Sequence, residues 1–144
     1  MVRILALDPS GTGTTGICLI NKKITFQEVQ SKNWKEHLEF INQLIQTYHP
    51  NLLLYENTHY LHHKNQDSLG LFRLLGALES LPIKKENILV SQVKDLKKRV
   101  FKGTKLIEGL GFIPGKGWFY QAQKISVHEL DAFLVYYLWK EQHA

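Results

Sequence analysis

The stretch that decides the fold is ILALDPSGTGTTG, residues 4–16. Apolar residues run up to an acid and a proline, which is typical of a buried strand, here expected at residues 3–7. The glycines after Pro9 predict a turn that leads back into a second strand. Because a buried charge is costly unless it is used, Asp8 at the end of this strand is a candidate functional residue.

Strands and helices alternate along the rest of the chain. We expect a hairpin of strands at 16–20 and 24–29, strands at 51–55 and 87–90, and helices at 33–50, 67–81, 92–101 and 126–139. Asn33 with Glu36, and Ser126 with Glu129, have the spacing of a capping box. The glycine-rich residues 109–117 predict a mobile loop.

This order of elements predicts a single α/β domain over residues 1–144. The first three strands should be antiparallel, and the later strands, which alternate with helices, should be parallel. The expected architecture is therefore a mixed sheet flanked by helices.

The composition is that of a globular intracellular protein. Of the 144 residues, 44% are hydrophobic, which is enough for a core without disulfide or metal staples. The single cysteine, Cys18, cannot form an internal disulfide and is expected to be a core residue. The first apolar stretch is too short for a signal peptide or a membrane span, so we expect a cytoplasmic protein without a membrane partner.

Positive charge is concentrated in one segment. The net charge is +5, and the segment 94–105 carries six cations against one acid. Such a patch attracts phosphates, although alone it is more typical of a solvated helix face. The candidate DNA-binding lysines of this segment are Lys94, Lys97, Lys98, Lys102 and Lys105.

Three acids stand at the ends of apolar elements. Asp8 and Glu56 each close an apolar strand, and Asp131 lies early in the apolar last helix. Neighbouring parallel strands would bring Asp8 and Glu56 together at the edge where α/β sheets bind ligands. A single such acid more often caps a helix or pairs with a surface cation, but three favour a site for Mg²⁺ or Mn²⁺, with two ions able to serve phosphodiester hydrolysis.

Two neighbours of Asp131 have different interpretations. His128 lies three residues before it and shares its helix face, so it is a candidate metal ligand or water-orienting residue. A lone histidine there is more often a simple hydrogen-bonding residue. Glu129 projects away from Asp131 and fits the capping box with Ser126, so it is not assigned to catalysis.

Four ordered motifs resemble the RuvC family of Holliday-junction resolvases. They are residues 4–16, residues 52–56 (LLLYE) with 64–68 (KNQDS) and the helix that follows, residues 91–94 (SQVK) with Val100 and Gly103, and residues 128–132 (HELDA). Each motif alone is weak, but together they cover most of the chain in the family's order.

The resemblance implies an RNase H-like fold, a homodimer and Mg²⁺-dependent nicking of branched DNA at paired symmetric sites, leaving 5′-phosphates. By position, Asp8, Glu56 and Asp131 carry over as catalytic metal-binding acids. His128 falls where some members have Asp and others His, which leaves its role open between ligand and base.

The sequence also departs from the family pattern. Ser10 stands where the family commonly has Gly. The family often places an aromatic three residues after the strand Glu, where His59 stands here beside Tyr60; either could stack on a base or be an ordinary loop residue. Residues 109–120 have no placeable counterpart and, with Lys116 and Trp118, could hold DNA or form a dimer contact.

Three other functions are compatible with parts of this pattern. Residues 8–15 also resemble the phosphate-binding hairpin of actin-like ATPases, but those enzymes need two related domains, and Glu56 and Asp131 would be unexplained. A catalytically weak DNA-binding protein of the same fold is the second alternative. The third is a nuclease of this fold that acts on RNA or ordinary DNA ends.

Overall fold

The computed structural model describes residues 2–57 and 66–144, with twelve elements. In chain order they are β1 (Ile4–Asp8), β2 (Thr14–Asn21), β3 (Lys23–Gln30), α1 (Trp34–Tyr48), β4 (Leu52–Asn57), α2 (Gln66–Glu79), β5 (Lys85–Leu89), α3 (Val90–Phe101), β6 (Leu110–Ile113), β7 (Gly117–Tyr120), β8 (Gln123–Ile125) and α4 (Val127–Gln142).

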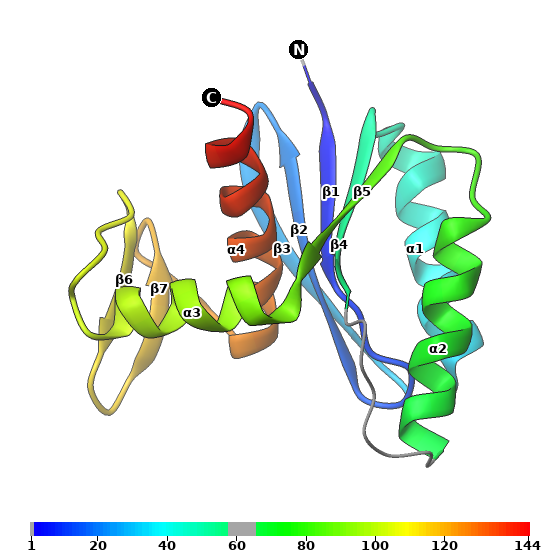
Figure 1. Ribbon diagram of the computed structural model, residues 1–144, viewed down its shortest axis with the longest axis horizontal. Coiled ribbons are helices and arrows are strands. Elements are labelled where there is room, and N and C mark those ends of the chain that lie inside the picture. Colours follow the sequence, from blue (N-terminus) through cyan, green and yellow to red (C-terminus); the bar gives the residue numbers. More distant parts are fainter. Residues whose placement is uncertain (1, 58–65) are drawn as a thin grey trace.

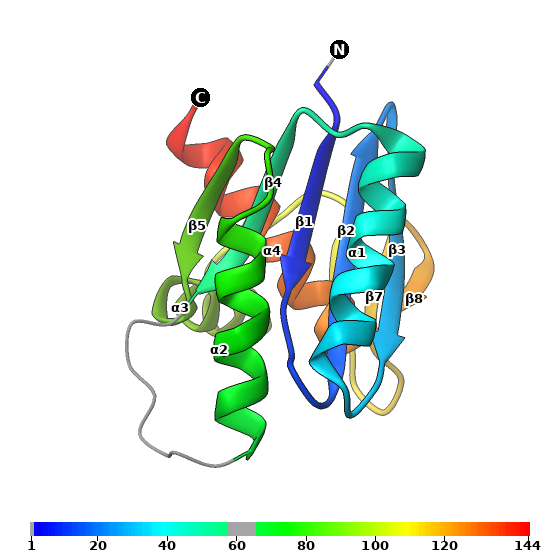
Figure 2. The same ribbon diagram turned by 90° about the vertical axis from the view of Figure 1, so that its right-hand side faces the viewer.

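The central layer is a five-stranded sheet in the order β3-β2-β1-β4-β5. β1, β2 and β3 pair antiparallel, whereas β1 with β4 and β4 with β5 pair parallel. Helices α1 and α2 cover one face, and α3 and α4 lie on the other (Figures 1 and 2). The predicted mixed sheet with flanking helices is confirmed.

The strands of the sheet bury both faces, so successive side chains alternate between two cores. Along β1, Ile4 and Ala6 pack with α3 and α4, whereas Leu5 and Leu7 pack with α1 and α2. Cys18 lies buried in the first of these cores, as predicted. This alternation fixes the face toward which the residue at each strand end projects.

The two predicted capping boxes have different outcomes. At α4, the Ser126 hydroxyl accepts from the Glu129 backbone N–H, and the Glu129 carboxylate accepts from the Ser126 N–H. At α1, Asn33 instead accepts from the Lys35 N–H, and the Glu36 carboxylate is occupied by the Ser31 hydroxyl. Only the α4 capping box is confirmed.

The prediction of a mobile loop at residues 109–117 is wrong. β6, β7 and β8 form a three-stranded antiparallel sheet beside α3 (Figure 1). Of the glycines that indicate a loop, Gly109 and Gly115 lie in turns, whereas Gly111 and Gly117 lie in strands. Gly115 has a φ of 80°, which favours glycine. Trp118 and Tyr120 project from β7 into the core shared with α4. Packing of alternate aromatic residues therefore stabilises this segment.

None of the helices formed by the described residues combines the length and the apolar character that crossing a bilayer requires.

The close approach of β2 to the start of α4 gives a testable prediction. A Cβ at Gly16 would overlap the backbone carbonyl of His128. We expect Gly16→Ala to destabilise the protein by about 2 kcal/mol, because α4 must shift to relieve the overlap. Thermal unfolding measures this change.

Gly76→Ala is the matched control. A Cβ at Gly76, on the exposed side of α2, meets no atom within 4 Å. This variant should gain about 0.5–1 kcal/mol, because alanine is the better helix former. Equal effects of the two substitutions would contradict the close packing of α4 on β2.

Candidate functional site

The parallel pairing of β1 with β4 places Asp8 and Glu56 side by side. Leu7 pairs with Tyr55, so the next position on each strand is an acid. The side-chain alternation puts both acids on the face that carries Ala6 and Leu54, which is the face covered by α4. β4 was expected to end before Glu56, but pairing of Glu56 with Ile88 of β5 extends it.

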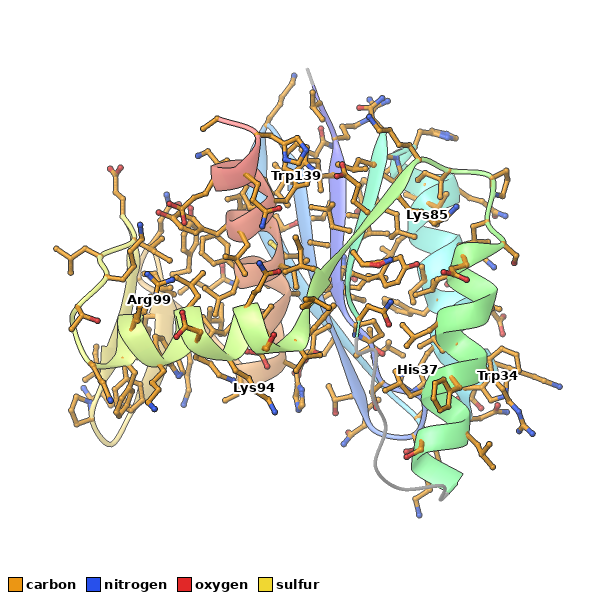
Figure 3. All side chains as sticks on the ribbon, in the orientation of Figure 1. Trp34, His37, Lys85, Lys94, Arg99 and Trp139 are labelled. Atoms are coloured by element: carbon orange, nitrogen blue, oxygen red, sulfur yellow. The ribbon has the colours of Figure 1, made fainter. Side chains whose placement is uncertain are left out.

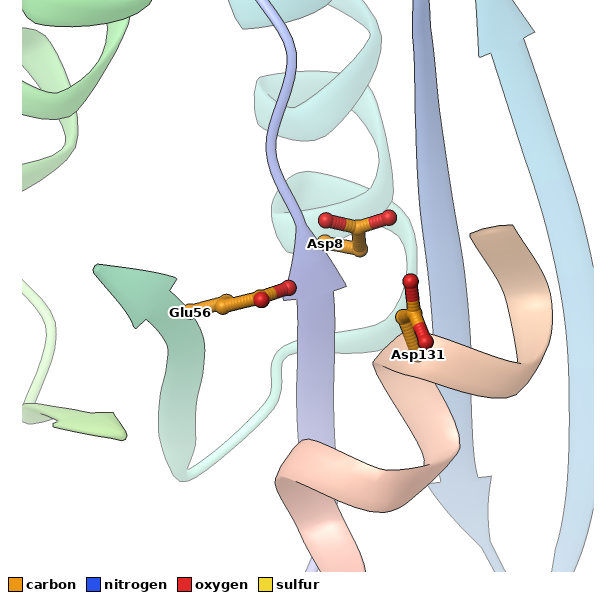
Figure 4. Close-up of side chains that lie close together, drawn as sticks. All are labelled: Asp8, Glu56 and Asp131. Carbon is orange, nitrogen blue, oxygen red and sulfur yellow. The ribbon is translucent and has the colours of Figure 1, made fainter. Parts of the chain in front are cut away.

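Asp131 completes the group from α4. Its neighbours Leu130 and Ala132 are buried in the core, which anchors this part of the helix against the sheet. The three carboxyl groups each offer an oxygen, and these oxygens lie within 4.8 Å of one another (Figure 4). The structure thus brings together the three acids that the sequence singled out from distant segments. We call Asp8, Glu56 and Asp131 the acid cluster.

The acid cluster carries unfavourable electrostatics of its own. Burial raises the pKa of Asp8 and of Glu56 above the ordinary carboxyl range, and the negative charge of Asp131 raises both further. A hydrogen bond between the two side chains opposes the rise in the pKa of Asp8 and adds to that of Glu56. The pair therefore retains a proton at a higher pH than isolated carboxyl groups do.

Lys97 supplies positive charge to the acid cluster. Its Nζ lies 2.9 Å from Asp131 Oδ1, and both side chains are largely shielded from solvent. The positive charge of Lys97 lowers the pKa of Asp8 and of Glu56 and so offsets part of the burial effect. The sequence suggested a DNA contact for Lys97, whereas its structural contact is with the acid cluster.

His128 borders the acid cluster from the first turn of α4. Its Nδ1 lies 3.4 Å from Asp8 Oδ2, and about half of the side chain is exposed. With Nδ1 directed at Asp8, the ring can present Nε2 to a bound substrate. The histidine therefore lies beside the cluster, as the shared helix face predicted, and its role remains a prediction.

The donor chemistry of the acid cluster fits a hard divalent cation. All its ligand atoms are carboxylate oxygens, which suit Mg²⁺ or Mn²⁺ better than zinc. Glu56 Oε2 is buried and makes no hydrogen bond to any described residue. A cation would supply the partner that this oxygen lacks and would remove the repulsion among the acids.

The other predicted DNA-binding residues have varied positions. Lys94, Lys98 and Lys102 are exposed along α3 and at its C-terminal end. Lys116 is exposed in the turn between β6 and β7. Lys105 instead pairs with Glu141 at 3.2 Å, about 15 Å farther along α4 than Asp131. His59 and Tyr60 lie outside the described residues.

A second basic region was missed by the sequence analysis. A hollow of about 540 Å³ between α1 and α2 is lined by Lys32, Lys35 and Arg73 together with Trp34. Trp34 and Lys94 lie on opposite sides of the sheet in Figure 3, so basic residues flank it on both sides. The cations of this hollow come from two separate segments, so no run of charge marked them in the sequence.

Comparison with solved structures identifies the fold of this chain. The sequence matches no protein-family model and no curated protein. A structure of T. thermophilus RuvC in complex with a Holliday junction substrate is similar over 94% of this chain and 90% of that one, with a TM-score of 0.58 and 15% identity. This chain has the RNase H-like fold of RuvC.

A second structure of Thermus thermophilus RuvC agrees. It matches 93% of this chain and 90% of its own length, with a TM-score of 0.53 and 16% identity. The resemblance to RuvC that the ordered motifs indicated is thus confirmed at the level of the fold. The likeness extends over nearly the whole of both chains.

The raised pKa values predict how stability depends on pH. Acids whose pKa is raised on folding bind protons more tightly in the folded state. The contribution of Asp8 and Glu56 to stability is therefore lost as pH rises from about 4 through their raised pKa values. We expect Glu56→Gln to raise the Tm of the metal-free protein at pH 8 by about 3 °C or more, because glutamine, unlike glutamate, gains no free energy of ionisation when the chain unfolds. Mg²⁺ should raise the Tm of the unaltered protein and have little effect on the variant.

Glu39→Gln is the control for this measurement, because Glu39 is exposed on α1. It should leave both the Tm and the response to Mg²⁺ unchanged. If Glu56→Gln lowers the Tm at pH 8 and leaves the response to Mg²⁺ intact, Glu56 is a stabilising structural acid and not part of a metal site.

Proposed function

We propose that this protein is a divalent-metal-dependent DNA endonuclease that cuts four-way junctions. The observation that carries the proposal is the convergence of Asp8, Glu56 and Asp131 within 4.8 Å on a RuvC-like fold. Three buried or half-buried acids of like charge have no structural benefit of their own, because their mutual repulsion opposes folding. Such a group is favourable where cations bind it.

Asp8, Glu56 and Asp131 would hold two Mg²⁺ ions, and Mn²⁺ would substitute for them, as it does at other sites with oxygen ligands. When bound, these ions polarise the phosphodiester, lower the barrier to attack by water and stabilise the departing oxygen. The acids would hold the ions at the carboxyl end of β1 and β4, where the scissile phosphate would bind. Cleavage of the bond to the 3′-oxygen leaves a 5′-phosphate.

His128 and Lys97 would assist through their contacts with two different acids of the cluster. With Nδ1 held toward Asp8, His128 can accept a proton from the attacking water at Nε2. Lys97 lies against Asp131 and can turn its ammonium group toward a substrate phosphate once cations neutralise that acid. The contacts of these two side chains with the cluster support both roles.

The exposed lysines of α3 would hold the DNA backbone. Lys94, Lys98 and Lys102 extend from the acid cluster along the helix, and contacts to phosphates fix the position of the duplex without reading its sequence. A homodimer would place two such sites across the two-fold axis of a four-way junction. Paired symmetric nicks follow from that arrangement.

The direct test is cleavage of a synthetic four-way junction beside a matched linear duplex. With Mg²⁺ or Mn²⁺ we expect paired nicks on the junction that EDTA abolishes. Asp8→Asn should reduce cleavage by at least ~100-fold. Loss of a residue that only hydrogen-bonds to a metal ligand costs about 10–100-fold in activity, and Asp8 is proposed as a ligand itself. Junction binding should remain, because the α3 lysines are unchanged.

Each of three outcomes would contradict the proposed function and indicate a different one. Binding of the junction without cleavage in either metal would indicate a DNA-binding protein of this fold. Cleavage of linear duplex or RNA in preference to the junction would indicate a different nuclease. Cleavage by Asp8→Asn at the rate of the unaltered protein would show that the acid cluster is not the metal site.

A further inference from the structure

A second hollow adjoins the acid cluster on the α3 side. It has a volume of about 310 Å³ and lies between α3, β7 and the start of α4. The residues that line it are Lys94, Lys97, Lys98, Phe101, Trp118 and Val127. Three cations and two aromatic rings therefore face one small space.

The aromatic wall of this hollow is unusually exposed. Phe101 is 58% exposed, and the neighbouring Phe112 is 38% exposed. The ring centroids of Phe101 and Phe112 lie 4.9 Å apart, and that of Phe112 lies 5.2 Å from Trp118. Trp118 is almost fully buried and anchors the group. A fixed aromatic surface that remains open to solvent is suited to a flat apolar partner.

Two lining residues connect the hollow directly to the acid cluster. Lys97 lines the hollow and also contacts Asp131 at 2.9 Å. Val127, which is half exposed, lines the hollow and precedes His128, whose ring faces Asp8. A DNA strand with its phosphate at the acid cluster would therefore have a neighbouring nucleotide at the hollow.

We propose that this hollow receives an unstacked base of single-stranded DNA next to the cleaved phosphate. The inference rests on the proposed nuclease function and adds to it a requirement for unpaired nucleotides beside the cut. The base stacks on Phe101, and Lys94 and Lys98 hold the flanking phosphates. Aromatic rings accept any base in this way, so the contact does not depend on sequence.

Charge favours a nucleic acid over a second copy of this chain. A symmetric dimer centred on this hollow would bring the three lysines of one copy against those of the other. That arrangement is repulsive, whereas phosphates on both sides of a base complement the lysines. The proposed occupant satisfies both the aromatic wall and the basic rim.

The test compares two strands of equal length and charge in EDTA, so that no cleavage occurs. One is a dye-labelled oligothymidylate and the other is a strand of abasic deoxyribose phosphates, with affinity measured by fluorescence anisotropy. We expect the unaltered protein to bind the strand with bases at least about fivefold more tightly. Phe101→Ala should remove this preference, and Phe101→Trp should retain it.

Two control variants separate stacking from general effects. Phe72→Ala removes an equally exposed phenylalanine from α2, on the other face of the sheet, and should leave the preference intact. Lys98→Ala should weaken binding of both strands by the same factor, because phosphates are common to both. If Phe101→Ala removes the preference for the strand with bases and Phe72→Ala does not, the base binds at this hollow.

The inference is overturned if the unaltered protein binds the two strands equally, or if Phe101→Ala leaves the preference in place. It is also overturned if Phe101→Ala converts a dimer to a monomer in light scattering, since the hollow would then hold a second copy. These results can be told apart from a failure of the nuclease proposal, because the binding assay contains no metal and measures no cleavage. Junction cleavage without a base preference would refute the base-binding hollow and leave the nuclease function standing. A base preference without cleavage would refute the nuclease function and leave the hollow as a base-binding site.

Discussion

Parallel pairing of β1 with β4 is the constraint on which the site depends. It fixes Asp8 beside Glu56, and side-chain alternation turns both toward α4, where Asp131 meets them. Because these three acids repel one another, hydrophobic burial along β1, β4 and α4 must hold them together. The stability of the two cores thus maintains a charge arrangement that is unfavourable by itself.

Much of this arrangement was predictable because it follows from local patterns. An acid that ends an apolar strand, as at Asp8 and Glu56, is visible in the sequence, and the order of strands and helices predicts which strand ends meet. The capping box of Ser126 with Glu129 marks where α4 begins, which in turn places Asp131 and His128 on one face. Each of these features can be predicted from the sequence pattern within a single helix or strand.

Contacts between distant segments could not be predicted in the same way. Lys97 belongs to a run of lysines with similar sequence surroundings, and only the packing of α3 near α4 directs it to Asp131. Phe101 resembles any apolar residue at a helix end, and its exposure depends on where β6 and β7 lie. That small sheet was itself missed, because turn glycines such as Gly115 also occur in irregular loops.

The most direct test of the account is the location of Mn²⁺ in crystals soaked with this ion, by its anomalous scattering. We expect one or two peaks among the carboxylates of Asp8, Glu56 and Asp131, at about 2.0–2.2 Å from their oxygens, the range typical of small divalent cations. Lys97 should then move away from Asp131. Absence of any peak there, with the contact between Lys97 and Asp131 retained, would contradict the claim that the acid cluster is a metal site.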